Sequence, residues 1–363
     1  MYRKLYRRLY LSANYRLRTA FGGRLAGLVR PTSIALLLTT RCNARCVHCD
    51  IWKNDGKEQD ALTLAEWRQV LSDMRRWLGP VPISITGGEA LLRPDAPDIA
   101  ACASGLCFFV EFLTNGYWKD QRRMAALAHA KPARITISLD GIGPSHSAVR
   151  GREDFWDTTN QSIQTLRQLR QQERLGYSIL LKTVIMAQNL GHVAEVAHFA
   201  ASNGLDVLYQ PIEQNYNAPD DPRWFERAPT WPRDCEKAVA TVDRLADLQR
   251  KGLPIVNSAG EFHAMRTYFL DPSGQGAAVQ AHAAHEGRAL CASLGNMQIQ
   301  PNGDVLTCCK RPPIGNVRSQ PIRTIWKMRP RWWEGGCCLE SQQERAQPTE
   351  AINGAIREAE QDE

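Results

Sequence analysis

Short apolar runs alternate with helical patterns along the first 212 residues of the chain. Each apolar run ends in glycine or polar residues, as buried strands do. The strand segments are residues 33–40, 81–89, 107–116, 133–141, 177–186 and 205–212. The helical segments are 63–78, 121–130, 158–174, 190–204 and, beyond the last strand, about 234–251. Such alternation predicts parallel strands joined by crossover helices, in an α/β open sheet or barrel.

Two local signals fix where elements begin and turn. Thr63 followed three residues later by Glu66 is a capping box, which predicts a helix start at this point. Asn302-Gly303, between two short apolar runs in 297–309, predicts a tight hairpin.

Changes in composition and pattern divide the chain into five parts. After residue 215 the regular alternation stops in a segment rich in Pro, Asp and Trp. The predicted parts are a basic arm (1–30), a core barrel (31–215), connecting helices and loops (216–290), a cysteine-bearing hairpin domain (291–340) and an acidic tail (341–363).

The positive charge is concentrated at the start of the chain. The formal net charge is +7, yet the arm alone holds eight basic residues and no acid, so the remainder is almost neutral. This distribution argues against a general nucleic-acid-binding surface, and no nucleic-acid partner is expected.

The arm has the pattern of an amphipathic helix. One face is basic, and the opposite face holds Tyr2, Leu5, Tyr6, Leu9 and Tyr10. Three interpretations fit this pattern: peripheral contact with a membrane surface, docking to a partner, or packing on the protein's own body.

No apolar run approaches the about 20 residues that a membrane-spanning helix requires. The run "IALLLTT" is too short for a signal peptide and leads directly into cysteines. We therefore expect a cytoplasmic protein with reduced thiols. In that setting, clustered cysteines bind metal or do redox chemistry more often than they form disulfides.

Three cysteines lie close together after the first strand. Cys42, Cys46 and Cys49 have the spacing C-x3-C-x2-C. A structural zinc ion takes four ligands, and His48 would be cramped as the fourth because it is adjacent to Cys49. An iron–sulfur cube held by three thiolates, with one iron open to an external ligand, explains the missing sulfur better.

This motif resembles the signature of the radical S-adenosylmethionine (SAM) enzymes, and the resemblance covers about residues 32–215. It implies a partial (β/α)6 TIM barrel whose [4Fe–4S] cluster binds SAM at the open iron. It also implies cleavage of SAM to a 5′-deoxyadenosyl radical, which abstracts hydrogen from a substrate C–H bond. An electron donor such as flavodoxin or ferredoxin is implied as well.

The ends of the later strands resemble the SAM-contacting segments of that family. "GGE" resembles the segment that contacts the SAM amino group, and "SLDG" with a following arginine resembles the pair that holds its carboxylate. His48 and the end of the sixth strand stand where contacts to the adenine are usual. The implied SAM contacts are His48, Gly87, Gly88, Glu89, Ser138, Arg150, Pro211 and Ile212.

A second group of cysteines lies near the C-terminal end. The hairpin with its flanking cysteines, followed by "IGNVRSQPIRTIW", resembles the auxiliary iron–sulfur domain called SPASM, or its shortened form called twitch. This adds a β-hairpin-plus-helix extension and one auxiliary [4Fe–4S] cluster. The implied ligands are Cys291, Cys308, Cys337 and Cys338, with Cys309 as the alternate. Adjacent cysteines depart from the usual spacing, and buried cysteines without metal are the alternative.

The expected substrate is a peptide or a small natural-product intermediate, which is oxidised or cross-linked. The residues expected to line its pocket are Tyr209, Gln210, Glu213 and Asn215. Two alternatives stay open at this point: the same radical chemistry on a lipid- or saccharide-pathway intermediate at a membrane, or a non-catalytic iron–sulfur protein.

Overall fold

The computed structural model describes residues 2–19, 25, 28–54, 60–215, 221, 223–272, 295–308 and 311–329. Six parallel strands form the core of the fold. They are β1 (Ser33–Leu37), β2 (Pro82–Thr86), β3 (Phe109–Thr114), β4 (Arg134–Ser138), β5 (Ser178–Ile185) and β6 (Asp206–Pro211). Each strand pairs with the next in chain order, as the alternating pattern predicts.

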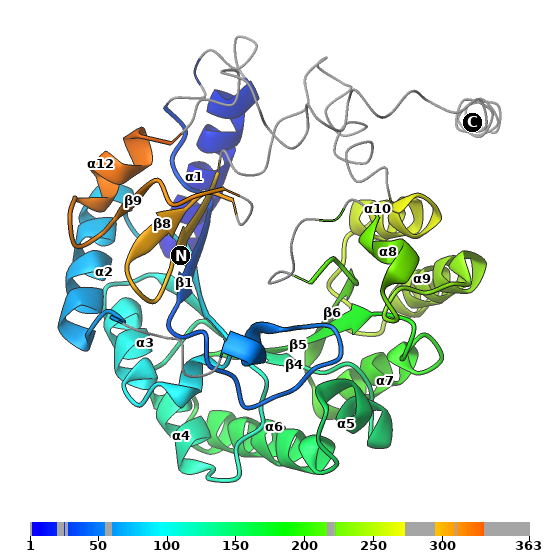
Figure 1. The fold of residues 1–363 in the computed structure, drawn as a ribbon. Helices are drawn as coiled ribbons and strands as arrows, with labels where there is room; N and C mark the ends of the chain where they lie inside the picture. Colours follow the sequence, from blue (N-terminus) through cyan, green and yellow to red (C-terminus); the bar gives the residue numbers. More distant parts are fainter. Residues whose placement is uncertain are drawn as a thin grey trace.

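Helices cover the outer face of this curved sheet (Figure 1). Those between the strands are α2 (Leu64–Leu78), α3 (Ala96–Gly105), α4 (Arg122–His129), α5 (Pro144–Arg150), α6 (Phe155–Gln172) and α7 (Val193–Asn203). The strands line the inside of an incomplete ring, which is the expected partial barrel.

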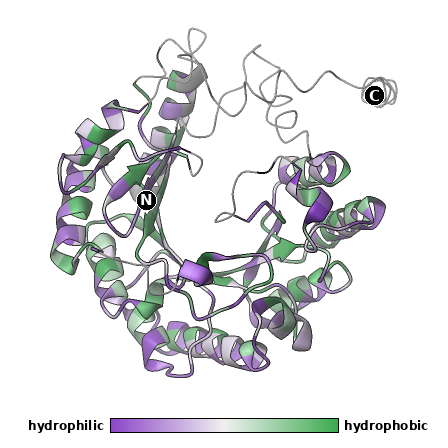
Figure 2. Cartoon of the chain, viewed as in Figure 1, coloured by the Kyte–Doolittle hydropathy of each residue, from purple (hydrophilic) through white to green (hydrophobic). Residues whose placement is uncertain are grey.

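The core lies between the strands and the helices. In Figure 2 the strands are mainly hydrophobic, whereas the helices carry hydrophilic residues on their outer sides. On β2, Ile83 and Ile85 are buried, while Pro82, Ser84 and Thr86 are half-buried. Helix α2 begins with the predicted capping box of Thr63 and Glu66 and buries Trp67 completely. The apolar face of the strands and the apolar face of the helices therefore pack against each other in one shared layer.

After β6 the chain adds helices to one end of the ring. They are α8 (Trp224–Arg227), α9 (Cys235–Arg250) and α10 (Ala259–Leu270). The hydroxyl of Tyr268 on α10 donates to the carbonyl oxygen of Ile212, at 2.9 Å, and this bond ties α10 to the end of β6.

The C-terminal hairpin continues the same sheet beyond β1. Strand β7 (Asn296–Ile299) pairs parallel with β1, and β8 (Asp304–Leu306) and β9 (Gly315–Asn316) follow antiparallel. The turn between β7 and β8 contains Asn302 and Gly303, as predicted. Helix α12 (Ile322–Lys327) completes the extension.

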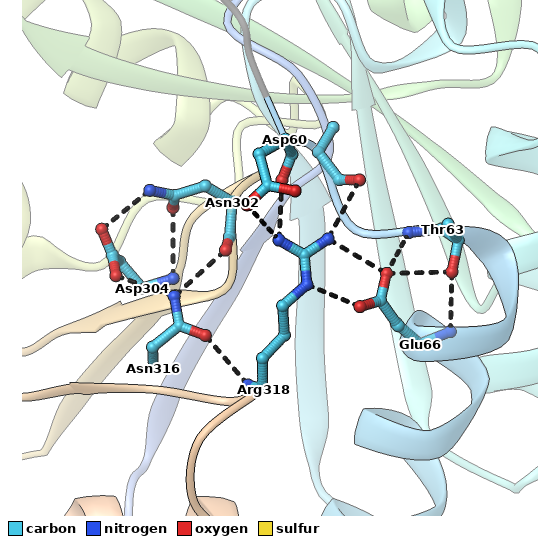
Figure 3. A network of polar contacts seen from close by, with 8 residues as sticks. Asp60, Thr63, Glu66, Asn302, Asp304, Asn316 and Arg318 are labelled. Carbon is cyan, nitrogen blue, oxygen red and sulfur yellow. Dashed lines mark hydrogen bonds and ion pairs between the residues drawn. The ribbon is translucent and has the colours of Figure 1, made fainter.

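A polar network joins this hairpin to the start of α2 (Figure 3). The Arg318 guanidinium donates to both carboxylate oxygens of Glu66, at 2.5 and 3.1 Å, and pairs with Asp60 at 2.7 Å. Asn316 donates to the Asn302 carbonyl and to the Asp304 carboxylate, which fixes the turn. We call Arg318, Glu66 and Asp60 the clamp.

Helix α1 (Tyr2–Thr19) packs on the ring through part of the predicted apolar face. The Tyr6 hydroxyl donates to the Leu78 carbonyl, and the Tyr10 hydroxyl donates to the Pro31 carbonyl, at 2.6 and 2.7 Å. Leu5 and Leu9, in contrast, are 55% and 61% exposed. The face predicted as one surface is therefore divided between the body of the protein and solvent. In the described residues, no helix combines the length and hydropathy needed to cross a bilayer.

Candidate cluster and cofactor site

The three cysteines of the N-terminal motif lie in the loop between β1 and the short helix η3 (Ile51–Asn54). This cluster loop is held against α5 by its backbone. The Arg45 amide donates to the Arg150 carbonyl at 3.1 Å, and the Val47 amide donates to the Val149 carbonyl at 3.0 Å. Gly151 permits this contact, since a Cβ there would lie 2.4 Å from the Arg45 carbonyl oxygen.

Burial governs the chemistry of the thiols. Cys46 is buried, and Cys42 and Cys49 are half-buried. Burial raises the pKa of Cys42 to about 12 and also raises the pKa of Cys49. The Cys42 and Cys49 thiols of the metal-free protein are therefore protonated at neutral pH. A bound metal centre must displace these protons, because the thiolate is the ligand.

A buried ion pair lies directly beside the thiols. The Arg150 guanidinium pairs with Asp140 at 2.6 Å, and a second nitrogen of it donates to the Cys46 sulfur at 3.5 Å. Both side chains are inaccessible or nearly so. The arginine holds the pKa of Asp140 below its usual value, so the carboxylate stays ionised despite its burial.

Asp140 is a site residue that the sequence reasoning missed, although it lies inside the "SLDG" segment. Its carboxylate also accepts from the Val184 amide at 2.9 Å, and its amide donates to His146 Nδ1 at 3.1 Å. Asp140 therefore joins β5 and α5 to the arginine. Ser138, predicted to act with Arg150, is half-buried at the end of β4, opposite Lys182 of β5.

Three buried nitrogen atoms in or beside this pair lack hydrogen-bond partners among the described residues, namely His48 Nδ1, His146 Nε2 and Arg150 Nε. Burial lowers the pKa of His48 to about 4, so its imidazole is neutral at neutral pH. Unpartnered buried polar atoms are costly unless a ligand or water satisfies them. Three thiols with unsatisfied polar groups beside them fit an iron–sulfur cluster with a polar ligand.

The two glycines of "GGE" allow the end of β2 to meet the cluster loop. A Cβ on Gly87 would lie 2.4 Å from the Thr39 carbonyl oxygen, and one on Gly88 would lie 2.2 Å from that of Arg41. The Gly88 and Glu89 amides donate to these same two carbonyls, both at 2.8 Å. Side chains at either glycine would therefore displace the loop that holds the cysteines.

Glu89 is buried between the ends of β2 and β3. Its carboxylate accepts from the Thr114 hydroxyl at 2.9 Å and from the Asn115 amide at 2.7 Å. Burial raises its pKa to about 7. Glu89 is therefore poised between its neutral and ionised forms near neutral pH.

Asn115, at the end of β3, is a second residue that the sequence reasoning missed. Its side-chain nitrogen lies 2.7 Å from the Asn43 amide oxygen and 3.9 Å from the Cys42 sulfur. Its backbone amide donates to Glu89. In the sequence Asn115 is only one of the polar residues at the end of a predicted strand, and nothing along the chain indicates its contact with Asn43.

The residues predicted along β6 do not share one direction. Tyr209 is buried, and its hydroxyl donates to the Val193 carbonyl of α7 at 2.8 Å, so it packs toward the helix layer. Ile212 is also buried, whereas Gln210 and Pro211 are half-buried.

Asn215 and Glu213 follow β6 near the cluster side of the ring. The Asn215 side-chain oxygen accepts from the Asp50 amide at 3.2 Å, so this position touches the residue after Cys49. Glu213 is exposed to solvent, yet the surrounding protein raises its pKa, and the nearby Lys182 opposes that shift. The pocket assignment of these residues remains a prediction.

The auxiliary site is described only in part. Cys308 is half-buried just after β8. Cys291, Cys309, Cys337 and Cys338, like the acidic tail, lie outside the described residues. In the part of the chain that the structure describes, no group of three His, Cys, Asp or Glu side chains converges as a single metal ion would require. A cube has a weaker requirement, since each thiolate binds a different iron.

Fold and site together define an iron–sulfur protein with its cluster loop at the carboxyl end of a parallel partial barrel. Two family models match the chain, the Radical SAM superfamily over residues 36–200 and an iron–sulfur cluster-binding domain, SPASM, over residues 291–346. The chain belongs to the radical SAM superfamily and has a C-terminal SPASM-type domain. Its cofactors are [4Fe–4S] clusters and SAM.

Curated relatives cover most of the chain at low identity. Pre-heme d1 synthase of Dinoroseobacter shibae is 27% identical over 83% of this chain and 76% of its own length. Mycofactocin maturase MftC of Mycobacterium tuberculosis is 26% identical over 83% of this chain and 71% of its own length.

Solved structures share the fold. SuiB of Streptococcus suis bound to S-adenosylmethionine has a TM-score of 0.61 at 15% identity, covering 82% of this chain. The match spans 66% of the SuiB chain. The enzyme anSMEcpe with bound AdoMet and a peptide has a TM-score of 0.55 at 12% identity, covering 81% of this chain and 79% of its own.

Proposed function

We propose that this chain cleaves SAM reductively and uses the resulting radical to abstract hydrogen from a C–H bond of a peptide or small natural-product intermediate. When bound, the cluster and SAM supply the 5′-deoxyadenosyl radical. The observation that carries the proposal is the placement of Cys42, Cys46 and Cys49 around a buried arginine at the mouth of the barrel. A carrier of electrons alone would have no use for an arginine and a glutamate buried beside the cluster.

The chain's own residues contribute orientation and charge in this proposal. The thiols would hold the cluster, with His48, Gly87 to Glu89, Ser138 and Arg150 around SAM. Asp140 would keep Arg150 in place through the ion pair at 2.6 Å. Glu213, exposed in an environment that raises its pKa, is a candidate proton acceptor on the substrate side.

The test is anaerobic reconstitution with SAM and dithionite, followed by measurement of 5′-deoxyadenosine. The wild type should form it, and the triple variant Cys42→Ala/Cys46→Ala/Cys49→Ala should not. Cys235→Ala is the matched control, because this half-buried cysteine lies on α9, outside the site. Protein with an intact cluster that forms no 5′-deoxyadenosine would instead be a non-catalytic iron–sulfur protein.

A peptide and a small molecule are both supported as substrate classes. One relative is named a maturase, and a structural neighbour was solved with a precursor peptide. Other relatives are named heme or heme-type synthases. Deuterium transfer from labelled substrate into 5′-deoxyadenosine discriminates them, since only the true substrate donates its hydrogen.

A second candidate function is the same chemistry at a membrane surface, and the exposed side of α1 favours it. Leu5 and Leu9 lie one turn apart and face solvent, beside the exposed Arg8 and Arg16. Exposed leucines flanked by arginines suit an anionic bilayer. The cytoplasmic location itself remains a prediction.

Vesicle co-sedimentation tests the membrane contact. Leu5→Ser/Leu9→Ser should weaken binding to phosphatidylserine vesicles by about tenfold or more, since two leucines leave the bilayer. Leu270→Ser, at an equally exposed leucine of α10, is the control. If both variants bind as wild type does, α1 is not a membrane contact.

A further inference from the structure

The outer side of the cluster loop carries a group of basic side chains. We call Arg45, Val47, Trp52, Lys53 and Arg152 the loop face. Four of these residues come from the loop and η3, and Arg152 comes from the turn after α5. Arg45, Val47, Lys53 and Arg152 are exposed, and Val47 alone is 47% exposed although it is apolar.

Contacts between neighbours show that these residues form one surface. The Arg45 guanidinium lies 5.8 Å from the centre of the Trp52 ring, and the Lys53 ammonium lies 5.6 Å from the same ring. Arg152 Nε donates to the carbonyl of Asn43, in the cluster loop, at 2.9 Å. The face therefore runs continuously from η3 across the loop to the start of α6.

The charge of this face is only partly neutralised. Lys53 pairs with Asp50 at 2.8 Å. Neither Arg45 nor Arg152 pairs with a carboxylate of the described residues, and Arg152 instead stacks over the Tyr117 ring at 5.4 Å. Arg152 itself lines a surface groove together with Glu153 and Asp157, and these carboxylates mark the limit of the positive region.

The loop face also lies on the side of the cluster site where the least protein covers the thiols. Arg45 and Val47 flank Cys46 in the chain, and Arg152 bonds to the residue after Cys42. Only the loop itself separates this surface from the thiols. The opposite side opens into the barrel, where SAM and substrate must bind if the proposed function holds. An electron delivered from the loop face crosses only the loop, whereas one delivered from the opposite side would have to pass through the barrel. Delivery from the loop face therefore does not compete with substrate.

We infer that the loop face docks an acidic one-electron carrier protein that reduces the cluster. This inference rests on the proposed function and names the partner surface that it requires. In the docked complex the carrier gives up one electron and the oxidised cluster gains it, with no proton or group transferred. The positive face attracts the acidic carrier from a distance, and Val47 and Trp52 supply apolar contact once it has docked.

Two electron donors of opposite charge test this inference on the full-length holoprotein. Reduced flavodoxin serves as the acidic protein donor, and the radical cation of methyl viologen serves as a small donor that needs no docking surface. The main variant is the double change Arg45→Glu/Lys53→Glu. A separate variant carries the single change Arg152→Gln. Arg244→Glu, at an exposed arginine of α9 far along the chain, is the matched control. Bleaching of the visible cluster absorbance and formation of 5′-deoxyadenosine are both followed.

Flavodoxin should reduce the double variant about tenfold or more slowly than wild type at low salt, and methyl viologen should reduce both at similar rates. Raising the salt concentration should slow flavodoxin with the wild type and affect the variant little. Equal rates with flavodoxin overturn the inference. An equal loss with both donors also overturns it, because the residues then hold the cluster rather than dock a partner. If the wild-type cluster bleaches but no 5′-deoxyadenosine forms, the proposed function is wrong. The bleaching rates would still show whether flavodoxin docks at the loop face.

Discussion

At the scale of single residues, the Asp140–Arg150 pair sets the character of the site. Both charges are removed from water, and their attraction offsets that cost only while both are present. The pair also places a fixed positive charge at the Cys46 sulfur, where thiolate character must develop. The pair therefore links the stability of the fold to the chemistry of the cluster loop.

Asp140→Asn should destabilise the metal-free protein by about 3–5 kcal/mol, because it leaves Arg150 buried without a counter-charge. Urea unfolding measures this change. Asp120→Asn, which breaks the exposed pair with Arg122, should change the stability far less, because water screens that pair. The double change Asp140→Leu/Arg150→Met should recover much of the loss. A double variant as unstable as Asp140→Asn would contradict the account.

Glu89 should make stability depend on pH. Its pKa is raised from 4.5 to about 7 in the folded protein. Between these values the folded state binds the proton more tightly than the unfolded state, so the contribution is fully present below 4.5 and is lost as pH rises through 7. The urea midpoint of the metal-free protein should fall over this window in wild type and less steeply in Glu89→Gln.

Glu66→Gln is the control for that titration. The Arg318 guanidinium lowers the pKa of Glu66 to about 2, so this carboxyl does not titrate between 4.5 and 7. Its slope over that window should match the wild type. If Glu89→Gln and wild type lose stability equally as pH rises, Glu89 is not the titrating group.

At the scale of elements, the clamp joins the C-terminal extension to the helix that follows the cluster loop. Glu66 caps α2 and also binds Arg318, so one carboxylate serves both the helix start and the hairpin. The backbone contributes as well, since the Leu62 amide donates to the Pro301 carbonyl at 2.7 Å.

Arg318→Ala should loosen the hairpin more than it lowers global stability. Hydrogen exchange should speed up over 296–306, while the midpoint of unfolding moves little, because the clamp is partly exposed. Arg76→Ala is the control, since it breaks an exposed pair on the same helix α2. Unchanged exchange in the hairpin would show that β7–β1 pairing alone holds it.

The elements with strong local signals were predictable from sequence. The capping box of α2 and the turn at Asn302-Gly303 lie where the residues indicate. Helix α5 was missed because seven residues carry too little periodicity. Helix α10 was also not predicted. It has a capping box, Ser258 with Glu261, but its apolar residues do not form one clear stripe.

The site was predictable where a motif marks it and not where tertiary contact creates it. The cysteine spacing led to the cluster loop directly. Asp140 accepts from the Val184 amide, 44 residues away, at 2.9 Å, and Asn115 donates to Asn43, 72 residues away, at 2.7 Å; no spacing along the chain reports that proximity. Tyr209 shows the opposite error, since a strand-end position did not reveal which face the ring occupies.

At the scale of the whole molecule, the extension places Cys308 at the end of a sheet shared with the cluster loop. If Cys308 is an auxiliary ligand, as the sequence predicts, Cys308→Ala should spare SAM cleavage and lose substrate product, because it leaves the first site intact. Simultaneous assays of 5′-deoxyadenosine and product measure this uncoupling. Cys102→Ala, at a half-buried cysteine of α3, is the control, and loss of both products in Cys308→Ala would assign the residue to the core fold.

The pairing of β1 with β7 has a consequence for how the protein is made. Strand β1 leaves the ribosome early, but its partner at Asn296–Ile299 follows more than two hundred residues later. Until then the apolar β1 has one edge without its partner, next to the loop that will receive iron and sulfide. Because this pairing joins strands so far apart in the sequence, it should slow the folding of the sheet and leave the nascent chain dependent on chaperones until β7 is made.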